Sequence, residues 1–206
     1  MTINRDFFFD HVREKLYPHG LNTSQLEGHE AILDAWEKNH AKSDDRWLAY
    51  ILATAYHETA FTMHAVRETL ANSDEQAAAR LEAAWDAGKL TWVKTQYWRR
   101  DPDGKYWFGR GLVQLTFKAN YKTLGDAINI DLVGDPDRAL ELGVAVKIIF
   151  HGMLNGSFTG HKLGDYFNTT KSDWVNARRI VNGLDRADAI AGYGKAYYAA
   201  LSYTVG

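Results

Sequence analysis

Cysteine is absent from this chain of 206 residues. Without it the protein forms no disulfide, holds no zinc ion through thiolates and uses no cysteine nucleophile. An excess of charge of one sign is also lacking, since the formal net charge is −2 and the basic residues are scattered along the chain. No strong field is available to attract a nucleic acid, and we expect no nucleic-acid partner.

Long hydrophobic runs are missing as well. No stretch approaches the roughly 18 uncharged apolar residues of a transmembrane helix, so we expect no transmembrane segment. Near the N-terminus, Phe7 to Phe9 is too short for the apolar part of a signal peptide and is followed at once by Asp10. We therefore expect synthesis in a cytoplasm without a signal peptide, and action elsewhere only if another factor releases the protein.

Apolar residues recur with the period of an α-helix along most of the sequence. A chain of this length suits one domain. We expect that domain to span residues 1–206, with N-terminal helices in 1–42 packed on a core of 43–206. Caps and apolar stripes mark the expected helices. These cover about 5–16, 24–38 (with a capping box from Ser24 to Glu27), Ser43 or Asp44 to about Glu58, 74–87, 117–128, 136–154, 171–181 and 186–203.

Residues 91–117 have a different character, because they are rich in aromatic side chains and turns. Asp101-Pro102-Asp103-Gly104 is a strong turn signal. We expect a small β element between about 97 and 117, ending in a strand over 112–117. Alternation along that strand places Val113, Leu115 and Phe117 on one face and Leu112, Gln114 and Thr116 on the other.

Glu58 is the first candidate for chemistry. At ~100° per residue it continues the apolar stripe of Trp47 and Ile51 along one face of its helix. Burial and the negative end of the helix dipole both disfavour a charged carboxylate there. A protonated carboxylic acid is what a general acid must be. A glutamate that merely caps the helix or forms a salt bridge fits the same spacing.

Hydrolysis of a glycosidic bond by the common mechanism needs a second carboxylate. The downstream candidates are Glu68, Asp74 and Glu75. Glu68 lies between Arg67 and Thr69, a cation and a hydroxyl that would keep it ionised and able to act as a base. A solvated surface glutamate is the alternative interpretation of the same residue.

Polar side chains at Gln114 and Thr116 need partners, which in a cleft can be substrate hydroxyls, amides or the attacking water. The glycines on both sides of Arg110 allow a tight turn and a close backbone approach. An exposed polar face of a small sheet is the alternative. His57-Glu58 begins like a zinc-protease helix, but the position that would complete the pattern is Phe61, so we expect no metal and no cofactor.

At these residues the sequence resembles glycoside hydrolase family 19, which contains chitinases and phage endolysins with a lysozyme-like fold. The matching pieces occur in family order over roughly residues 43 to 200. They are Tyr56-His57-Glu58-Thr59, the aromatic and Gly-Arg-Gly stretch from Tyr106 to Thr116, Asn120-Tyr121, Asp131 to Pro136, and Ile180-Val181-Asn182-Gly183. Leu184 departs from the family pattern, in which a second glycine often follows Asn-Gly.

The resemblance implies a mainly α, lysozyme-like α+β fold with a substrate cleft between two helical lobes. It implies Glu58 as general acid, Glu68 as general base and Thr116 as the holder of the attacking water. Further substrate contacts are expected from Gln114, Asn120, Tyr121, Asn182 and Arg110. A supporting arginine for the base is expected at Arg178, Arg179 or Arg186.

The implied catalytic residues do not distinguish chitin from peptidoglycan, because both polymers are β-1,4-linked and N-acetylated. A compact chain without cysteines, a signal peptide or an added carbohydrate-binding module resembles a phage endolysin more than a secreted chitinase. We therefore expect a monomer that cleaves peptidoglycan for host-cell lysis and reaches the wall through a holin. A chitinase and a catalytically inactive sugar-binding protein on the same fold are the alternatives.

Overall fold

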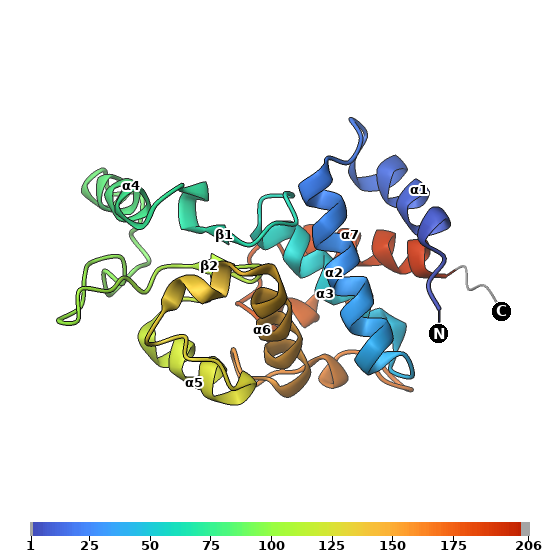
Figure 1. The fold of residues 1–206 in the computed structure, drawn as a ribbon. Helices are drawn as coiled ribbons and strands as arrows, with labels where there is room; N and C mark the ends of the chain where they lie inside the picture. The colour runs from blue at the N-terminus through green and yellow to red at the C-terminus, as the bar shows by residue number, and fades with distance from the viewer. Residues whose placement is uncertain (1, 203–206) are drawn as a thin grey trace.

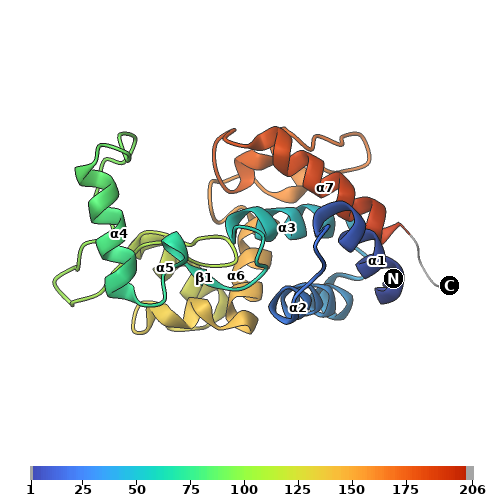
Figure 2. The same cartoon turned by 90° about the horizontal axis from the view of Figure 1, so that it is seen from above.

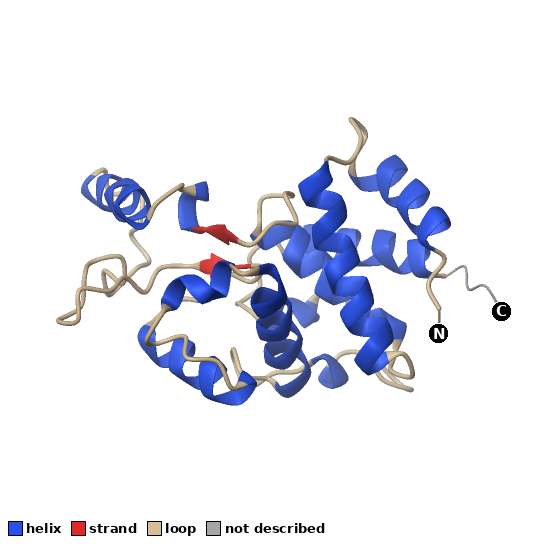
Figure 3. Cartoon of the chain, in the orientation of Figure 1, coloured by secondary structure: helices blue, strands red, loops and turns tan. Residues whose placement is uncertain are grey.

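The computed structural model describes residues 2–202, which form seven α-helices, four short 3-10 helices (η) and one two-stranded sheet (Figures 1 and 3). The α-helices are α1 (Arg5–Leu16), α2 (Thr23–His40), α3 (Asp45–Glu58), α4 (Asp74–Asp86), α5 (Lys118–Ile128), α6 (Leu142–Asn155) and α7 (Ala187–Leu201). The remaining elements are β1 (Val66–Arg67), η1 (Glu68–Leu70), β2 (Arg110–Gly111), η2 (Pro136–Leu140), η3 (Leu163–Asp165) and η4 (Asn176–Ile180). Within the described range every helix is too short or too polar to span a bilayer.

The predicted helices over the N-terminal 90 residues agree with the structure because their start signals are local. The side chains of Asn4, Asn22, Asp44 and Ser73 each accept a backbone N–H in the first turn of the helix that follows. One detail of the prediction was wrong. The capping box of α2 is formed by Asn22 and Gln25, not by Ser24 and Glu27.

Two predicted helices are shorter than expected. The segment 136–154 breaks at Glu141, whose extended backbone separates η2 from α6. The segment 171–181 is helical only over η4, because the Asp173 side chain binds the backbone and side-chain amides of Asn176 and holds a turn instead. The last helix, α7, ends at Leu201, and the predicted end at Tyr203 lies outside the described residues.

The β element differs from the prediction as well. β2 pairs antiparallel with β1, a segment upstream of the predicted region, with Val66 opposite Gly111 and Arg67 opposite Arg110. The strand expected over 112–117 is a tight turn, closed by a bridge between Arg110 and Leu115. Gln114 has a left-handed backbone with φ 52°. The alternation is therefore lost, and Leu112, Val113 and Leu115 are all buried.

Helix α3 lies at the centre of the main hydrophobic core. Its residues from Leu48 to Tyr56 are all buried. α3 packs against α7, α1 also packs on α7, and α2 contacts both α3 and α6 (Figures 1 and 2). A helix that is buried on all sides fixes the direction in which its last residue, Glu58, projects.

A smaller lobe extends away from this body, with α4 at its far side (Figure 2). It is formed by α4 and the irregular segment 87–109, and it has its own apolar cluster. The buried members of that cluster are Ala71, Ala77, Leu81, Trp98 and Phe108. The chain therefore has a helical body and a small second lobe, as a lysozyme-like fold with a cleft requires.

The chain reverses sharply after α3. Ala60, Phe61 and Met63 have left-handed backbones, with φ of 49°, 70° and 54°. Tyr17 and Gln25 each donate a hydrogen bond of 3.1 Å to the Phe61 carbonyl oxygen, and the Met63 side chain is fully buried. These contacts stabilise a backbone conformation that non-glycine residues rarely adopt.

Gly28 of α2 allows this reversal to pack closely. A Cβ atom at position 28 would lie 1.9 Å from the Met63 carbonyl oxygen, which is backbone and cannot move aside. We expect Gly28→Ala to lower the free energy of unfolding by at least about 2 kcal/mol, measured by chemical denaturation. Gly192→Ala in α7 is the matched control, because a Cβ there meets open space and should stabilise by up to about 1 kcal/mol. Equal stability of the two variants would contradict this account.

Candidate active site

Glu58 is the last residue of α3, and its carboxylate contacts an arginine from a distant part of the chain. Arg178 of η4 donates from Nη1 to Glu58 Oε1 at 2.6 Å, and its Nε donates to the Asp185 carbonyl oxygen at 3.1 Å. The Arg178 side chain is 3% exposed and that of Glu58 is 15% exposed. The guanidinium is therefore fixed by the fold, while the carboxylate keeps limited access to solvent.

Glu68 follows β1 directly and is bound by neutral donors instead. Its Oε1 accepts from the Tyr97 hydroxyl at 2.8 Å and its Oε2 accepts from the Gly109 amide at 2.7 Å. Burial raises the pKa of Glu68, and the two hydrogen bonds only partly oppose that increase. A carboxylate with a raised pKa is the stronger base, which suits it to remove a proton from water.

The surroundings of Glu68 differ from the prediction. Arg67 does not contact it, because its guanidinium binds Asp74 and Asp137. Arg178, one of the three arginines expected to support the base, binds Glu58 and not Glu68. Asp74, an alternative candidate for the base, is bound to Arg67 and Arg110, and Glu75 forms an exposed ion pair with Arg100.

The turn after β2 presents the Thr116 hydroxyl, which donates to the Gln114 carbonyl oxygen at 2.9 Å. That bond uses the hydroxyl hydrogen and leaves the oxygen lone pairs available to accept from a water. Asn120, on the first turn of α5, donates to the Thr116 carbonyl oxygen at 2.7 Å and so supports the same turn.

A pocket of about 430 Å³ lies beside Thr116 and Asn120. The small lobe and the body both contribute to it, and three predicted site residues, Thr116, Asn120 and Asn182, are among those lining it. The other lining residues are Trp92, Val93, Lys94, Thr95, Tyr97, Phe117 and Val181. Trp92 is 73% exposed and Phe117 is also exposed, so the pocket offers apolar rings together with amide and hydroxyl groups.

Neither Glu58 nor Glu68 lines this pocket, but hydrogen-bonded residues link each of them to it. Tyr97 lines the pocket and donates to Glu68. Asn182 also lines it, and its backbone amide donates to the carbonyl oxygen of Arg178, whose guanidinium binds Glu58. Glu68 is therefore linked to the pocket through one residue, and Glu58 through two.

Three predicted substrate contacts have side chains that bind other parts of the fold. Arg110 is 1% exposed and binds Asp74, Asp137, the Tyr106 carbonyl and Tyr121. Tyr121 is fully buried, and its hydroxyl donates to the Phe108 carbonyl oxygen at 2.9 Å. The Gln114 amide nitrogen binds the carbonyl oxygens of Val66 and Gly111. These three side chains hold the turn and the strands in place, and none of them lines the pocket.

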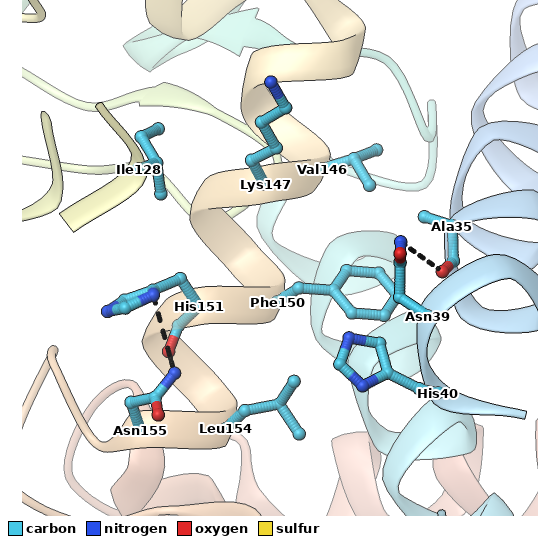
Figure 4. Close-up of a pocket in the computed structure, with 10 residues that line it drawn as sticks. All are labelled: Ala35, Asn39, His40, Ile128, Val146, Lys147, Phe150, His151, Leu154 and Asn155. Atoms are coloured by element: carbon cyan, nitrogen blue, oxygen red, sulfur yellow. Dashed lines mark hydrogen bonds between the residues drawn. The ribbon is translucent and has the colours of Figure 1, made fainter. Parts of the chain in front are cut away.

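A second pocket, of about 340 Å³, lies where α2, α5 and α6 meet (Figure 4). His40, Phe150 and Leu154 are among its lining residues. Its asparagines are bound within their own helices, Asn39 to the Ala35 carbonyl and Asn155 to the His151 carbonyl (Figure 4). None of the predicted site residues lines it, whereas three of them line the first pocket.

Sequence reasoning missed Tyr97 and Trp92. Tyr97 lies in the aromatic segment 91–117, but only the fold shows that its hydroxyl reaches Glu68, 29 residues away. The exposed Trp92 had a usable signal, since an indole next to a turn-rich, polar stretch is often a ligand contact.

Comparisons with known proteins show the family and the fold of this chain. The family model of chitinase class I, glycoside hydrolase family 19, matches residues 36–154. Chitinase 11 of Oryza sativa subsp. japonica is 35% identical over 74 residues, covering 28% of this chain and 29% of the rice protein. An alpha-amylase inhibitor/endochitinase of Coix lacryma-jobi is 31% identical over 90 residues, covering 44% and 53%. The matches thus span about half or less of these curated relatives.

Solved structures share the fold over nearly the whole chain. A bacterial family 19 chitinase superposes with a TM-score of 0.54 at 20% identity, covering 100% of this chain and 98% of that one. Chitinase C from Streptomyces griseus HUT6037 gives 0.60 at 18% identity, covering 100% and 78%. A class IV chitinase from Zea mays gives 0.54 at 15% identity, covering 98% and 94%. At these identities the likeness concerns the fold.

Tyr97→Phe tests the assignment of Glu68 as the base. The change removes a hydrogen bond that lowers the pKa of Glu68, so that pKa should rise further above the ordinary value of 4.5. A base must be ionised, and the acid limb of the pH–rate profile of hydrolysis should therefore move to higher pH. Tyr106→Phe on the same lobe, whose hydroxyl accepts from Arg100, is the matched control and should leave the limb in place. If the acid limb of the profile does not move in Tyr97→Phe, the assignment of Glu68 as the base is contradicted.

Proposed function

Because the chain belongs to glycoside hydrolase family 19, the class I chitinase family, we propose that it hydrolyses β-1,4 bonds between N-acetylglucosamine units of chitin. One observation carries the proposal. Glu68 is bound by Tyr97, which lines the pocket, and Glu58 is bound by Arg178, whose carbonyl oxygen is bound by the pocket residue Asn182. The two carboxylates therefore have contrasting partners. The assignment of Glu58 as acid and Glu68 as base follows the family resemblance, because the contacts of the two carboxylates alone do not assign these roles.

Glu58 is the general acid in this proposal. It donates its proton to the glycosidic oxygen as the bond to the anomeric carbon breaks, so that the leaving sugar departs as a neutral alcohol. Glu58 is then an anion, and the Arg178 guanidinium at 2.6 Å stabilises it. Arg178 thereby lowers the cost of losing the proton at the moment of transfer.

Glu68 is the general base. It removes a proton from a water molecule, whose oxygen attacks the anomeric carbon from the face opposite the leaving group. The lone pairs of the Thr116 hydroxyl can accept the second hydrogen of that water, because the Thr116 hydrogen is already donated to Gln114. This arrangement leaves a lone pair of the water free to attack.

The lining of the pocket suits N-acetylated sugars. Exposed rings at Trp92 and Phe117 can stack on the apolar faces of sugar rings. The side-chain amides of Asn120 and Asn182 can bind acetamido or hydroxyl groups. Lys94 is the single charged side chain at the pocket, so a neutral polymer fits it.

Chitin is placed before peptidoglycan in this proposal, contrary to the expectation from the sequence alone. That expectation was based on the lack of cysteine and on the expected absence of a signal peptide and of an added carbohydrate-binding module. The relatives named above are chitinases, and none of them supports the endolysin assignment. Peptidoglycan has the same N-acetylated β-1,4 backbone and is therefore the second polymer to test.

Digestion of both polymers, followed by mass spectrometry of the products, tests the proposal. We expect the wild type to release N-acetylglucosamine oligomers from chitin. Glu58→Gln keeps the shape but removes the proton, and should lower turnover by ~10²-fold or more while the protein stays folded. Glu27→Gln, an exposed change on α2, is the control.

A folded Glu58→Gln protein with near-normal turnover would mean that the acid is elsewhere. Muropeptides released from peptidoglycan, with chitin left intact, would revive the endolysin assignment. A wild type that binds chitin oligomers without cleaving them would instead point to the inactive sugar-binding alternative.

The stereochemistry of cleavage gives a second test. Single displacement requires the two carboxyl groups to lie ~6.5–9.5 Å apart, with room for a water between them, and it inverts the anomeric centre. NMR of a chitin oligomer at early times should therefore show the α-anomer released first from the β-linkage. A β-anomer would remove Glu68 from the role of base and point to a retaining reaction.

A further inference from the structure

Four side chains of alternating charge form a closed ring next to the short sheet. Arg67 and Arg110 are direct cross-strand partners in β1 and β2. Like charges in such positions repel each other. Asp74 binds both arginines, at 2.7 Å to Arg67 Nε and 2.5 Å to Arg110 Nη2. Asp137 also binds both, at 2.5 Å to Arg67 Nη2 and 2.9 Å to Arg110 Nε. We call these four residues the charge ring.

The charge ring is neutral and largely withdrawn from solvent. Arg110 is 1% exposed, Arg67 and Asp74 are 20% and 25% exposed, and Asp137 is 46% exposed. Each carboxylate uses both of its oxygens, and each arginine contacts both carboxylates. Paired contacts of this kind fix the orientation of each guanidinium relative to the carboxylates as well as the distance between them.

The charge ring joins the two lobes at the place where the chain passes between them. Asp74 is the first residue of α4 in the small lobe, and Asp137 lies in η2 of the body. Arg67 and Arg110 belong to the two strands that lead into and out of the small lobe. Figure 1 shows this short sheet between α4 and the helical body. The ring therefore ties both lobes to the same pair of strands.

The same pair of strands holds the base. Glu68 follows Arg67, and Gly109 precedes Arg110. The Glu68 amide donates to the Gly109 carbonyl oxygen at 2.7 Å, and the Gly109 amide donates back to Glu68 Oε2 at 2.7 Å. A shift between the strands would break this second bond, because it depends on the register that the ring fixes.

We propose that the charge ring is a positioning device for the base: Arg67, Asp74, Arg110 and Asp137 lock the register that places the Gly109 amide on the Glu68 carboxylate. The inference rests on the proposed function only for the role of Glu68 as base. The ring residues do not touch the substrate in this scheme. They act through Glu68, so their loss should affect turnover more than binding.

A double variant, Arg67→Gln with Asp137→Asn, tests the proposal. It removes one cation and one anion, so the net charge near Glu68 is unchanged and a shift in its pKa reports geometry. Lys122→Gln with Asp126→Asn, an exposed pair on α5 at 2.7 Å, is the matched control. Three quantities are measured: kcat and KM on a soluble chitin oligomer, the pKa of Glu68 from its carboxyl carbon by NMR, and hydrogen exchange of the Gly109 and Leu52 amides.

We expect the ring variant to raise the pKa of Glu68 further and to speed exchange at Gly109, with Leu52 in the core of α3 unchanged. The kcat should fall about 10-fold while KM stays within about 2-fold, since small misplacements of a catalytic group are costly. The control variant should match the wild type in all three measurements.

The proposal is overturned if kcat, the Glu68 titration and Gly109 exchange match the wild type. It is also overturned if Leu52 exchange rises as much as that of Gly109, because the ring would then act on global stability alone. If the double variant does not fold, the single variant Asp137→Asn takes its place, because Asp137 is the most exposed residue of the charge ring. Exchange of its Gly109 and Leu52 amides is then compared in the same way. The NMR measurements do not require turnover. A wild type without activity would therefore refute the proposed function, while the Glu68 titration and the Gly109 exchange would still test whether the charge ring positions Glu68.

Discussion

The close contact between Gly28 and the backbone of Met63 is the constraint on which the rest of the site depends. Ten residues separate Glu58 from Glu68, and on a continuous helix they would lie ~15 Å apart along the axis. The chain instead leaves α3 at Glu58 and reverses through three left-handed residues. That reversal is supported by α2, through the missing side chain at Gly28 and the hydrogen bond from Gln25, and by the hydrogen bond from Tyr17 at the end of α1. The N-terminal helices therefore help to place Glu58 and Glu68 although none of their residues lines the pocket.

The two carboxylates that the proposed reaction uses as acid and base differ in their contacts. Glu58 faces a buried cation, Arg178, whereas Glu68 faces an amide and a phenol hydroxyl. In the proposed reaction, Arg178 stabilises the anion that forms at Glu58, and burial raises the pKa of Glu68, which accepts a proton. The sequence argument assigned burial to Glu58 and a cationic neighbour to Glu68. The structure reverses both partners, because Arg67 turns to Asp74 and Asp137 while Arg178 arrives from the far end of the chain.

Local signals explain what could be predicted from the sequence. Caps at Asn4, Asp44 and Ser73 and the stripe of α3 depend on neighbouring residues, so those helices and the position of Glu58 at a helix end were predictable. Tertiary contacts decide the rest. The turn over 112–117 forms because Gln114 binds Val66, and Tyr97 and Arg178 reach their carboxylates across 29 and 120 residues. Motif spacing and helical periodicity cannot predict a contact between residues so far apart in the sequence.

The Gly-Arg-Gly stretch shows why a recognisable motif need not mark a substrate contact. Its arginine lies beneath the surface, where it binds Asp74 and Asp137 and contacts the Phe108 ring at 4.2 Å. Its second glycine has φ 87°, and a Cβ there would lie 2.8 Å from the Ala139 carbonyl oxygen. Burying an arginine is costly unless every contact is made, and this one has both carboxylates in place. The motif therefore specifies how the strands, the small lobe and the body meet, and the residues that face the pocket, Thr116 and Asn120, follow it along the chain.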